Sequence, residues 1–252
     1  MKRFILSLFV ILALGVSAWS QTVIVAAAAN ISSVEASLKE AFVQKNPGMS
    51  LQFSFGASGA LVTQILNGAP FQVFLSADRG FAQKVVDAGL ASGPVKTYAV
   101  GKLIFLATKP IDLSKGIAVV LDPAVVQYAN CNPETAPYGR AATEALTNAG
   151  LFDRVKSKQV TAQTITQAVQ FTLTATNFGF VNKSALYTKE AAPYNQEGKF
   201  WFEVDPKLYA PIEQGFVVVK SAETLPAVKA FAEFLLSPEA QKVFADFGYG
   251  KP

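Results

Sequence analysis

Short apolar runs alternate with helical patterns of apolar residues along most of this chain. Residues 22–27 predict a buried strand as a short, almost wholly apolar run, and residues 51–55 predict a second strand. Between them, Ile31, Val34 and Leu38 recur at helical spacing and predict a helix. Alternation of this kind predicts βαβ units and a largely parallel sheet.

The alternation continues to the end of the chain. Further strands are expected at residues 73–76, 103–107, 117–121, 178–181 and 216–219, and further helices at residues 60–67, 78–88, 138–149, 164–173, 224–236 and 238–247. No repeat or Gly/Ser-rich linker interrupts this pattern. Two domains would therefore be connected by crossing strands rather than by a flexible tether.

The first twenty residues follow a different pattern. Lys2 and Arg3 precede a continuous apolar run over residues 4–16, and small residues follow it. This order predicts a secretory signal peptide over residues 1–20, cleaved after Ser20 or Ala18. The run is shorter than the ~20 apolar residues of a membrane-spanning helix. We therefore expect a periplasmic protein.

Composition removes much chemistry from consideration. The chain has no histidine, which is the commonest general base and metal ligand, and its single cysteine, Cys131, excludes an internal disulfide. The formal net charge of +4 falls to +2 without Lys2 and Arg3, since 20 basic residues then face 18 acidic ones. Charges of both signs are mixed along the chain, so nucleic acid is not an expected partner.

Small, neutral residues with hydrogen-bond donors follow the first two predicted strands. In open α/β sheets, ligands bind beyond the carboxyl ends of strands, where the N-termini of helices also point. Asn30, Ser32 and Ser33 occupy the first junction, and residues 56–59 occupy the second. Unpaired N–H groups at helix starts favour an anion. The alternative is that Ser32 and Ser58 only cap their helices.

Enzymatic alternatives fit these residues poorly. Residues 56–60 superficially resemble the nucleophile elbow of hydrolases, but no histidine can activate Ser58. An exported serine hydrolase is thus a remote alternative. No Gly-rich loop ending in Lys-Ser or Lys-Thr is present, and the carboxylates have no metal-ligand spacing. We expect a protein that is not an enzyme and has no directly bound metal.

Five segments, in order, make the chain similar to the periplasmic molybdate-binding proteins, the solute-binding components of molybdate importers. They are Val-Ala-Ala-Ala-Ala-Asn at 25–30, Phe-Ser-Phe-Gly-Ala-Ser-Gly-Ala-Leu at 53–61, Gly-Ala-Pro-Phe-Gln-Val-Phe-Leu-Ser-Ala-Asp at 68–78, Tyr-Ala-Val-Gly-Lys-Leu at 98–103 and Asn-Pro-Glu-Thr-Ala-Pro-Tyr-Gly-Arg-Ala at 132–141. Gln72 stands where the family usually has an acidic residue. The resemblance covers essentially the whole chain after the signal peptide.

The resemblance implies a type II periplasmic binding protein fold. In this α/β fold, two lobes with mixed sheets flanked by helices enclose a ligand cleft. The first lobe would be discontinuous, with residues 21–100 and 210–252. The second lobe would contain residues 101–209.

The resemblance also implies a set of ligand-binding residues. Asn30 and Ser58 match two ligand positions of the family, and Tyr138 and Ile165 match two positions that offer a backbone N–H. Some members add a tyrosine hydroxyl near the following short strand. Asn182 is the fifth candidate, although it lacks that hydroxyl, so the chain is more similar to members that carry tyrosine at position 138 and lack the later one.

The implied ligand is molybdate, with tungstate beside it because the two ions are nearly equal in size. Molybdenum would enter only as this oxyanion, without a cofactor. The implied partner is the membrane permease of an ABC importer, and we expect a monomer. Because sequence does not report cavity size, a binding protein of the same fold for sulfate or another tetrahedral oxyanion stays the alternative.

Overall fold

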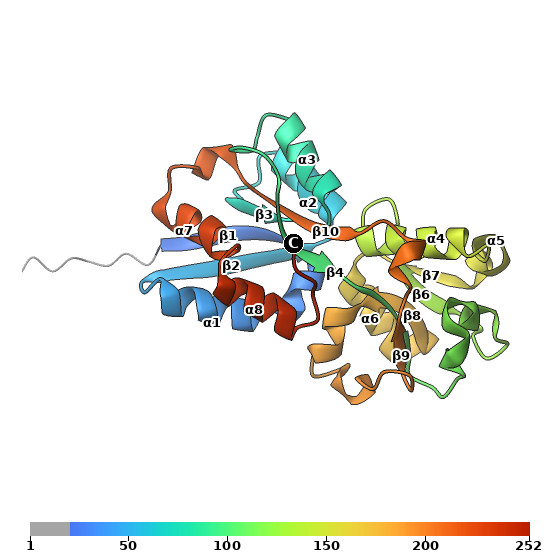
Figure 1. The fold of residues 1–252 in the computed structure, drawn as a ribbon. Helices are drawn as coiled ribbons and strands as arrows, with labels where there is room; N and C mark the ends of the chain where they lie inside the picture. The colour runs from blue at the N-terminus through green and yellow to red at the C-terminus, as the bar shows by residue number, and fades with distance from the viewer. Residues whose placement is uncertain (1–20) are drawn as a thin grey trace, which may run out of the picture.

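The computed structural model describes residues 21–252, which form two five-stranded mixed sheets, each flanked by helices (Figure 1). The predicted signal peptide, residues 1–20, lies outside the described residues. Each sheet with its helices forms one lobe, and the two lobes lie side by side in Figure 1. This is the expected two-lobed α/β architecture.

The sheet of the first lobe has the strand order β2-β1-β3-β10-β4. Its strands are β1 (Gln21–Ala28), β2 (Met49–Gly56), β3 (Val73–Leu75), β4 (Lys96–Gly101) and β10 (Ile212–Val218). β1 pairs in parallel with β2 and β3, whereas β10 is antiparallel to both β3 and β4. The late strand β10 thus lies inside a sheet whose other strands come from the first 101 residues.

The sheet of the second lobe has the strand order β7-β6-β8-β5-β9. Its strands are β5 (Leu103–Ala107), β6 (Tyr128–Cys131), β7 (Gln159–Ala162), β8 (Phe178–Asn182) and β9 (Trp201–Glu203). β6 is parallel to β7 and β8, and β5 is antiparallel to β8 and β9. The chain changes sheets between Gly101 and Leu103 and again between Glu203 and Ile212.

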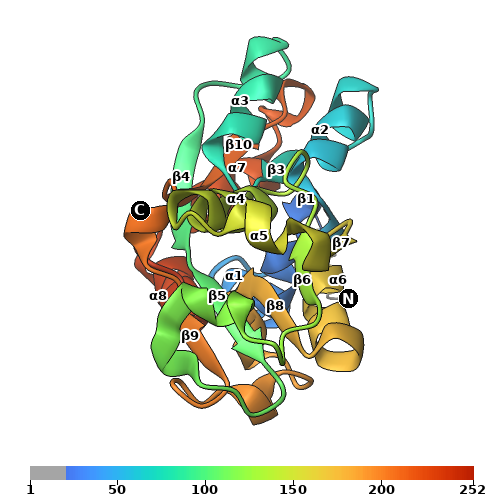
Figure 2. The same cartoon turned by 90° about the vertical axis from the view of Figure 1, so that its right-hand side faces the viewer.

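Helices cover both sheets (Figures 1 and 2). The first lobe carries α1 (Glu35–Lys45), α2 (Ser58–Leu66), α3 (Arg79–Asp87), α7 (Pro226–Phe234) and α8 (Pro238–Asp246). The second lobe carries α4 (Pro137–Asn148), α5 (Phe152–Val155) and α6 (Ile165–Phe171). The short 3-10 helices that concern the site are η1 (Ala29–Ser33), η5 (Lys183–Tyr187) and η6 (Ala192–Tyr194). No helix within residues 21–252 is long and apolar enough to cross a membrane.

Aromatic side chains pack the inside of each lobe. Phe42 of α1 contacts Phe231 and Phe234 of α7 edge to face, with ring centroids 5.4 Å apart in both pairs. In the second lobe, Phe180 of β8 packs in the same way against Phe105, at 5.2 Å. Such pairs add to the stabilisation from burial itself. The second core continues across the lobe boundary to alanines at the ends of β1 and β3.

One predicted strand is wrong. Residues 117–121, Ile-Ala-Val-Val-Leu, belong to η2 (Leu113–Leu121), a pair of helical turns separated by a kink at Gly116. Asp112 accepts a hydrogen bond from the Ser114 N–H at 3.0 Å and starts the first turn. The β-branched side chains Val119 and Val120 are still fully buried, so burial alone explains the apolar run that predicted a strand.

Candidate functional site

Four of the five predicted site residues line one small cavity between the lobes. Asn30 and Ser58 come from η1 and α2 of the first lobe, and Tyr138 and Ile165 come from α4 and α6 of the second. Alanine, glycine and proline residues line the rest of the cavity. Its volume is about 10 Å³, far below the ~300–1,000 Å³ of pockets for organic ligands. The cavity is therefore too small for an organic ligand.

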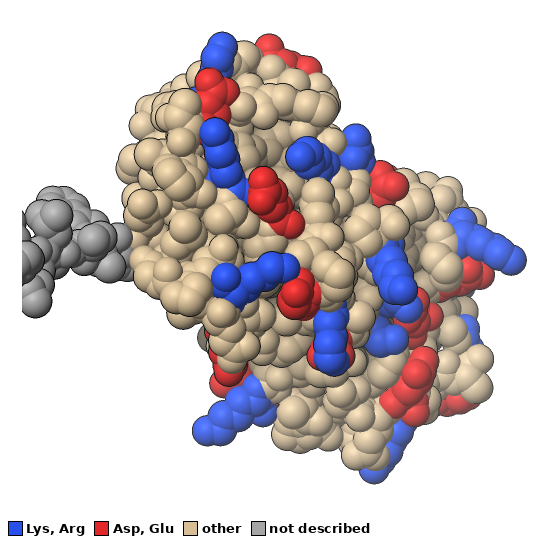
Figure 3. All heavy atoms as spheres, turned by 60° about the vertical axis from the view of Figure 1, so that its left-hand side comes forward, with Lys and Arg blue, Asp and Glu red and all other residues tan. Residues whose placement is uncertain are grey.

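No charged side chain lines this cavity. Lysine, arginine, aspartate and glutamate side chains are instead scattered over the outer surface, as one face shows in Figure 3. The starts of η1, α2, α4 and α6 all meet the cavity, and the unpaired N–H groups of helix starts carry partial positive charge. The field at the cavity thus favours an anion, and no carboxylate lines the cavity that would attract a cation.

Ser58 is buried and is the first residue of α2. Its Oγ accepts a hydrogen bond from the Ala77 N–H at 3.0 Å, and the hydroxyl hydrogen has no protein acceptor within residues 21–252. The N-cap position belongs to Ala57, and no side chain caps this helix. The capping alternative for Ser58 is therefore wrong, and its hydroxyl and backbone N–H remain as donors.

Tyr138 contributes a backbone N–H at the start of α4, whereas its hydroxyl lies elsewhere. Pro137 is the first residue of α4 and has no N–H, so Tyr138 has the first N–H of that helix. Its side chain is buried and reaches the hinge strand β4, where a Cβ on Gly101 would overlap the Tyr138 hydroxyl. Gly139 is equally constrained, because a Cβ there would overlap the Cys131 carbonyl. These two glycines allow α4 to start against β6 and the hinge.

Ile165 is the buried first residue of α6. Thr164 caps the helix by accepting a hydrogen bond from the Gln167 N–H at 3.2 Å, which leaves the Ile165 N–H without a partner in its own helix. The next residue, Thr166, donates from its hydroxyl to the Ala29 carbonyl across the lobe boundary at 3.1 Å. This bond joins the start of α6 to η1.

The side-chain amide of Asn30 is held inside the protein. Its Nδ2 donates to Gln214 Oε1 and to Tyr249 Oη, both at 2.8 Å, while its buried Oδ1 has no hydrogen-bond partner. Both Nδ2 hydrogens are thus used. Asn30 is the second residue of η1, so its backbone N–H has no partner within that 3-10 helix and is the donor that remains for a ligand.

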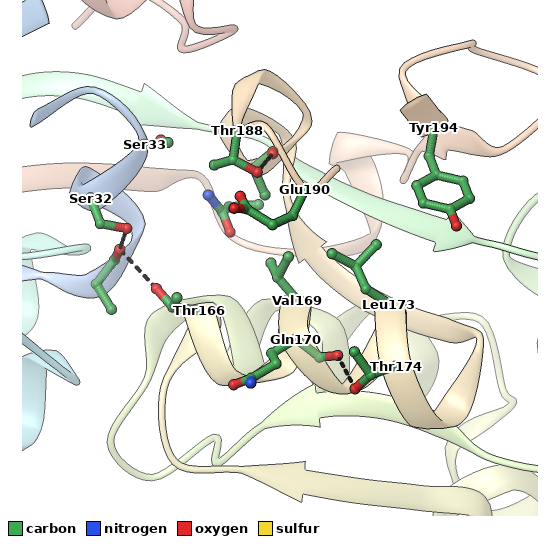
Figure 4. Close-up of a pocket in the computed structure, with 13 residues that line it drawn as sticks. Ser32, Ser33, Thr166, Val169, Gln170, Leu173, Thr174, Thr188, Glu190 and Tyr194 are labelled. Carbon is green, nitrogen blue, oxygen red and sulfur yellow. Dashed lines mark hydrogen bonds between the residues drawn. The ribbon is translucent and has the colours of Figure 1, made fainter. Parts of the chain in front are cut away.

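Asn182 lies apart from the other four candidates. It lines a neighbouring cavity of about 490 Å³, which also runs between the lobes (Figure 4). Ser32 and Ser33 lie on one side of this cavity, and side chains of the second lobe such as Val169 and Glu190 lie on the other. Asn182 Nδ2 donates to Ser184 Oγ at 2.6 Å, so this side chain is hydrogen-bonded to another residue of the protein.

An ion pair joins the lobes near the cavity. Asp78 caps α3 by accepting from the Phe81 N–H at 2.7 Å, and its other oxygen pairs with Arg140 of α4. The Arg140 side chain is 45% exposed, against 11% for Asp78. Close by, the Gly59 N–H donates to the Thr135 carbonyl at 3.0 Å. The first turn of α2 is therefore tied directly to the loop before α4.

Two residues of the site region carry no sequence signal. Gln214 lies inside β10 and Tyr249 lies in the C-terminal tail, 184 and 219 residues from Asn30. Neither lies at a junction between a strand and the next helix, where the sequence predicts ligand-binding residues. Both are buried, but a single polar residue in an apolar segment does not reveal its partner.

Buried hydroxyl and thiol groups here keep their protons. Burial raises the pKa of Tyr249 to about 12 and that of Cys131 to about 12. Burial, together with nearby tyrosines, raises the pKa of Tyr138 well above its ordinary value. The fully buried Cys131 is a packing residue next to the Asn132 loop. No cluster of acidic and cysteine residues that could hold a metal ion occurs within residues 21–252.

These features define a class of protein that encloses a small anion between two lobes, and comparison with known proteins gives its family. Residues 23–250 match the profile of the bacterial extracellular solute-binding proteins, so the chain belongs to that family.

The chain is 37% identical over 246 residues to the molybdate-binding protein ModA of Rhodobacter capsulatus, covering 96% of this chain and 94% of that protein. It is also 37% identical over 239 residues to the molybdate-binding protein ModA of Azotobacter vinelandii, with coverage of 94% and 93%. The solved periplasmic molybdate-binding protein of Azotobacter vinelandii superposes with a TM-score of 0.83 at 31% identity, covering 91% of this chain and 99% of that one. As a member of the solute-binding family, this chain is a binding protein and not an enzyme.

Proposed function

We propose that this protein captures molybdate, and tungstate beside it, for delivery to the membrane permease of an ABC importer. The observation that carries the proposal is the convergence of four helix starts on one small, uncharged cavity. Relatives named as molybdate-binding proteins match nearly the whole chain and support this choice of ligand.

The donors around the cavity favour an oxyanion without a proton. The Ser58 hydroxyl and the N–H groups of Asn30, Ser58, Tyr138 and Ile165 are all hydrogen-bond donors, and no carboxylate lines the cavity. Molybdate, tungstate and sulfate carry no proton near neutral pH, whereas phosphate retains one and is better served by a carboxylate acceptor. The proton that phosphate retains therefore disfavours it at a site of donors alone, and size is left to separate sulfate from molybdate.

Further parts of the proposal concern the chain as a whole. We infer that residues 1–20 direct export, which agrees with an extracellular solute-binding family, and that the exported protein acts as a monomer. For the lobes we propose the limits 21–100 with 210–252, and 101–209. The two changes of sheet, near Gly101 and before Ile212, support these limits.

Calorimetric titration with molybdate, tungstate, sulfate and phosphate in parallel tests the ligand. We expect tight binding of molybdate and tungstate, with sulfate and phosphate weaker. A saturating oxyanion also stabilises the folded state, by about 4 kcal/mol at a thousandfold excess over Kd. Tighter binding of sulfate would transfer the proposal to the sulfate alternative.

Ser58→Ala tests the site. Loss of a hydrogen bond to a charged ligand costs about 1.5–3 kcal/mol, which is roughly tenfold to over a hundredfold in affinity. Thr63→Ala is a control in the same helix, because the Thr63 hydroxyl bonds only to the Gly59 carbonyl on an exposed surface. Unchanged molybdate affinity in Ser58→Ala would remove Ser58 from the site.

A further inference from the structure

The hydroxyl of Tyr249 is a junction of three hydrogen bonds. It accepts from Asn30 Nδ2 at 2.8 Å and donates to the Asn30 carbonyl at 3.0 Å. It also accepts from Ser184 Oγ at 3.1 Å. A phenol hydroxyl has one hydrogen and two lone pairs, so all its hydrogen-bonding capacity is used.

The direction of each bond in this cluster is fixed. Gln214 Nε2 donates to the carbonyls of Ala77 and Ile212, at 3.0 and 3.1 Å, so Gln214 Oε1 must face Asn30. The Asn30 amide is then oriented with Nδ2 toward Gln214 Oε1 and Tyr249 Oη. Rotating either amide by half a turn would place two acceptors together, and each amide therefore keeps one orientation.

The cluster crosses from one lobe to the other. Asn30 and Gln214 belong to the first lobe, and Tyr249 is fixed there because Gly250 pairs with Val100 of β4. Ser184 belongs to η5 of the second lobe and accepts from Asn182 of β8 at 2.6 Å. Asn182, Ser184, Tyr249 and Asn30 are each at most 6% exposed, so water does not compete strongly for these bonds.

We propose that Tyr249 is a positioning residue that couples the anion site to the approach of the second lobe. Tyr249 holds Asn30 at its carbonyl and at its side chain, and thereby fixes the first turn of η1, whose residues Ala29 and Asn30 line the cavity. Ser184 reaches Tyr249 only while η5 lies against the first lobe. The inference rests on the proposed function at this cavity, and it gives Asn182 an indirect role as the donor that orients Ser184.

Coupling of this kind is reciprocal. If contact between Ser184 and Tyr249 improves anion binding, then a bound anion must favour that contact by the same free energy. Removing the tyrosine hydroxyl should break the coupling and loosen Asn30. Removing the serine hydroxyl should break the coupling while leaving Asn30 bound to Tyr249.

Titration and stopped-flow kinetics with molybdate on Tyr249→Phe, Ser184→Ala and the double variant test the proposal. We expect about a tenfold loss of affinity in Tyr249→Phe and about a threefold loss in Ser184→Ala, mainly as faster dissociation, since net contributions of neutral hydrogen bonds are about 0.5–1.5 kcal/mol. The double variant should equal Tyr249→Phe alone, because Ser184 acts through Tyr249. Additive losses, or no loss in either single variant, would overturn the proposal.

Tyr128→Phe is the matched control. Tyr128 is a buried tyrosine of the second lobe whose hydroxyl contacts Gln159, remote from the cluster. It should leave affinity unchanged and combine additively with Ser184→Ala. If Tyr249→Phe does not fold, the molybdate affinity of Ser184→Ala is compared with that of Tyr128→Phe. Equal affinities of these two variants would contradict the coupling.

A measurement without ligand separates this inference from the proposed function. Spin labels on the exposed positions Val43 and Val126 of the two lobes report the distance between the lobes. Tyr249→Phe and Ser184→Ala should both shift the ligand-free protein toward larger separations, and Tyr128→Phe should not. Absence of anion binding by the unmutated protein would defeat the proposed function, whereas an unchanged distance distribution in both variants would defeat the coupling.

Discussion

Two kinds of contact join the lobes around the same cavity, and they differ in charge and exposure. The Tyr249–Ser184 contact is neutral and buried, and its direction is fixed by neighbouring amides. The Asp78–Arg140 contact is an ion pair in which the arginine is nearly half exposed. Exposed ion pairs contribute about 0–1 kcal/mol and weaken in salt, whereas buried hydrogen-bond networks depend strongly on each member. The buried contact is therefore the better candidate to transmit ligand binding between lobes.

The largest expected effect comes from placing a charge in the neutral cluster. Asn30→Asp replaces two donated hydrogens by a carboxylate next to Gln214 Oε1 and beside the anion cavity. We expect molybdate affinity to fall by more than about a hundredfold, because an unsatisfied buried acceptor costs about 1–3 kcal/mol and an unpaired buried charge costs more. Calorimetry at neutral pH measures the loss, with Asn67→Asp at the exposed end of α2 as a control for added charge. Affinity within tenfold of the unmutated protein would contradict this view of the cluster.

Alkaline pH should break the same cluster by ionising it. Because burial raises the pKa of Tyr249 to about 12, from an ordinary value near 10, the unfolded chain loses this proton first. The stability contributed by the protonated form is complete below about pH 10 and is lost as pH rises through about 12. The loss amounts to about 3 kcal/mol for two pKa units.

Urea unfolding between pH 8 and 12 measures this dependence. The free energy of unfolding should fall less steeply with pH in Tyr249→Phe than in the unmutated protein. Lysines and other buried tyrosines titrate in both proteins, so the difference between the two curves isolates Tyr249. Parallel curves would show that its hydroxyl is not held in its protonated form by burial.

A smaller effect is expected at the ion pair. Asp78→Asn removes the charge but retains an oxygen that can cap α3, since asparagine is as good an N-cap as aspartate. Molybdate affinity should fall by no more than about fivefold at low salt. The difference from the unmutated protein should shrink as salt is raised. Tyr249→Phe, by contrast, should lose affinity equally at low and high salt. A salt-independent effect of Asp78→Asn would show that the two contacts do not differ in their dependence on charge.

The smallest effect should come from Tyr138→Phe. The tyrosine backbone, whose N–H begins α4, is unchanged by this substitution, and the ring still fills the space above Gly101. Molybdate affinity should stay within about twofold, which calorimetry can resolve. A tenfold loss would mean that the hydroxyl, and not the backbone alone, takes part in binding.

Local sequence patterns predicted the site residues whose positions depend on residues close to them in the chain. Asn30 and Ser58 follow the first two strands, so strand and helix order directed attention to them, whereas Tyr138, the second residue of α4, was implied by the resemblance. Gln214 and Tyr249 were not predicted, because each meets Asn30 through contacts that span most of the chain. Ser58 is a further example of a contact that local patterns do not predict, since its Oγ accepts a hydrogen bond from the Ala77 N–H of a different segment.

The fold was predicted with the same limits. Strands with strong apolar runs, such as β1 and β5, lie where the sequence expected them. The strands β4, β6, β7 and β9 were not expected. The last three have only three or four residues, which carry little periodic signal, whereas β4 has six residues that the apolar pattern did not mark as a strand. The alternation alone predicted a largely parallel sheet, which is wrong. The resemblance implied the mixed sheets that the structure has, with β10 antiparallel to β3 and β4, and β5 antiparallel to β8 and β9.

The position of β10 has a consequence for how the chain acquires its structure. Its residues, Ile212–Val218, separate β3 from β4 and provide the backbone partners of both. β1, β2 and β3 can pair without these residues, but β4 cannot join the sheet until they are synthesised, and the pairing must then close a loop of more than a hundred residues. Contacts of such sequence separation slow folding. The amides of β4 and β10 should therefore gain protection from hydrogen exchange together and late during refolding, a delay that would suit a chain crossing a membrane in unfolded form.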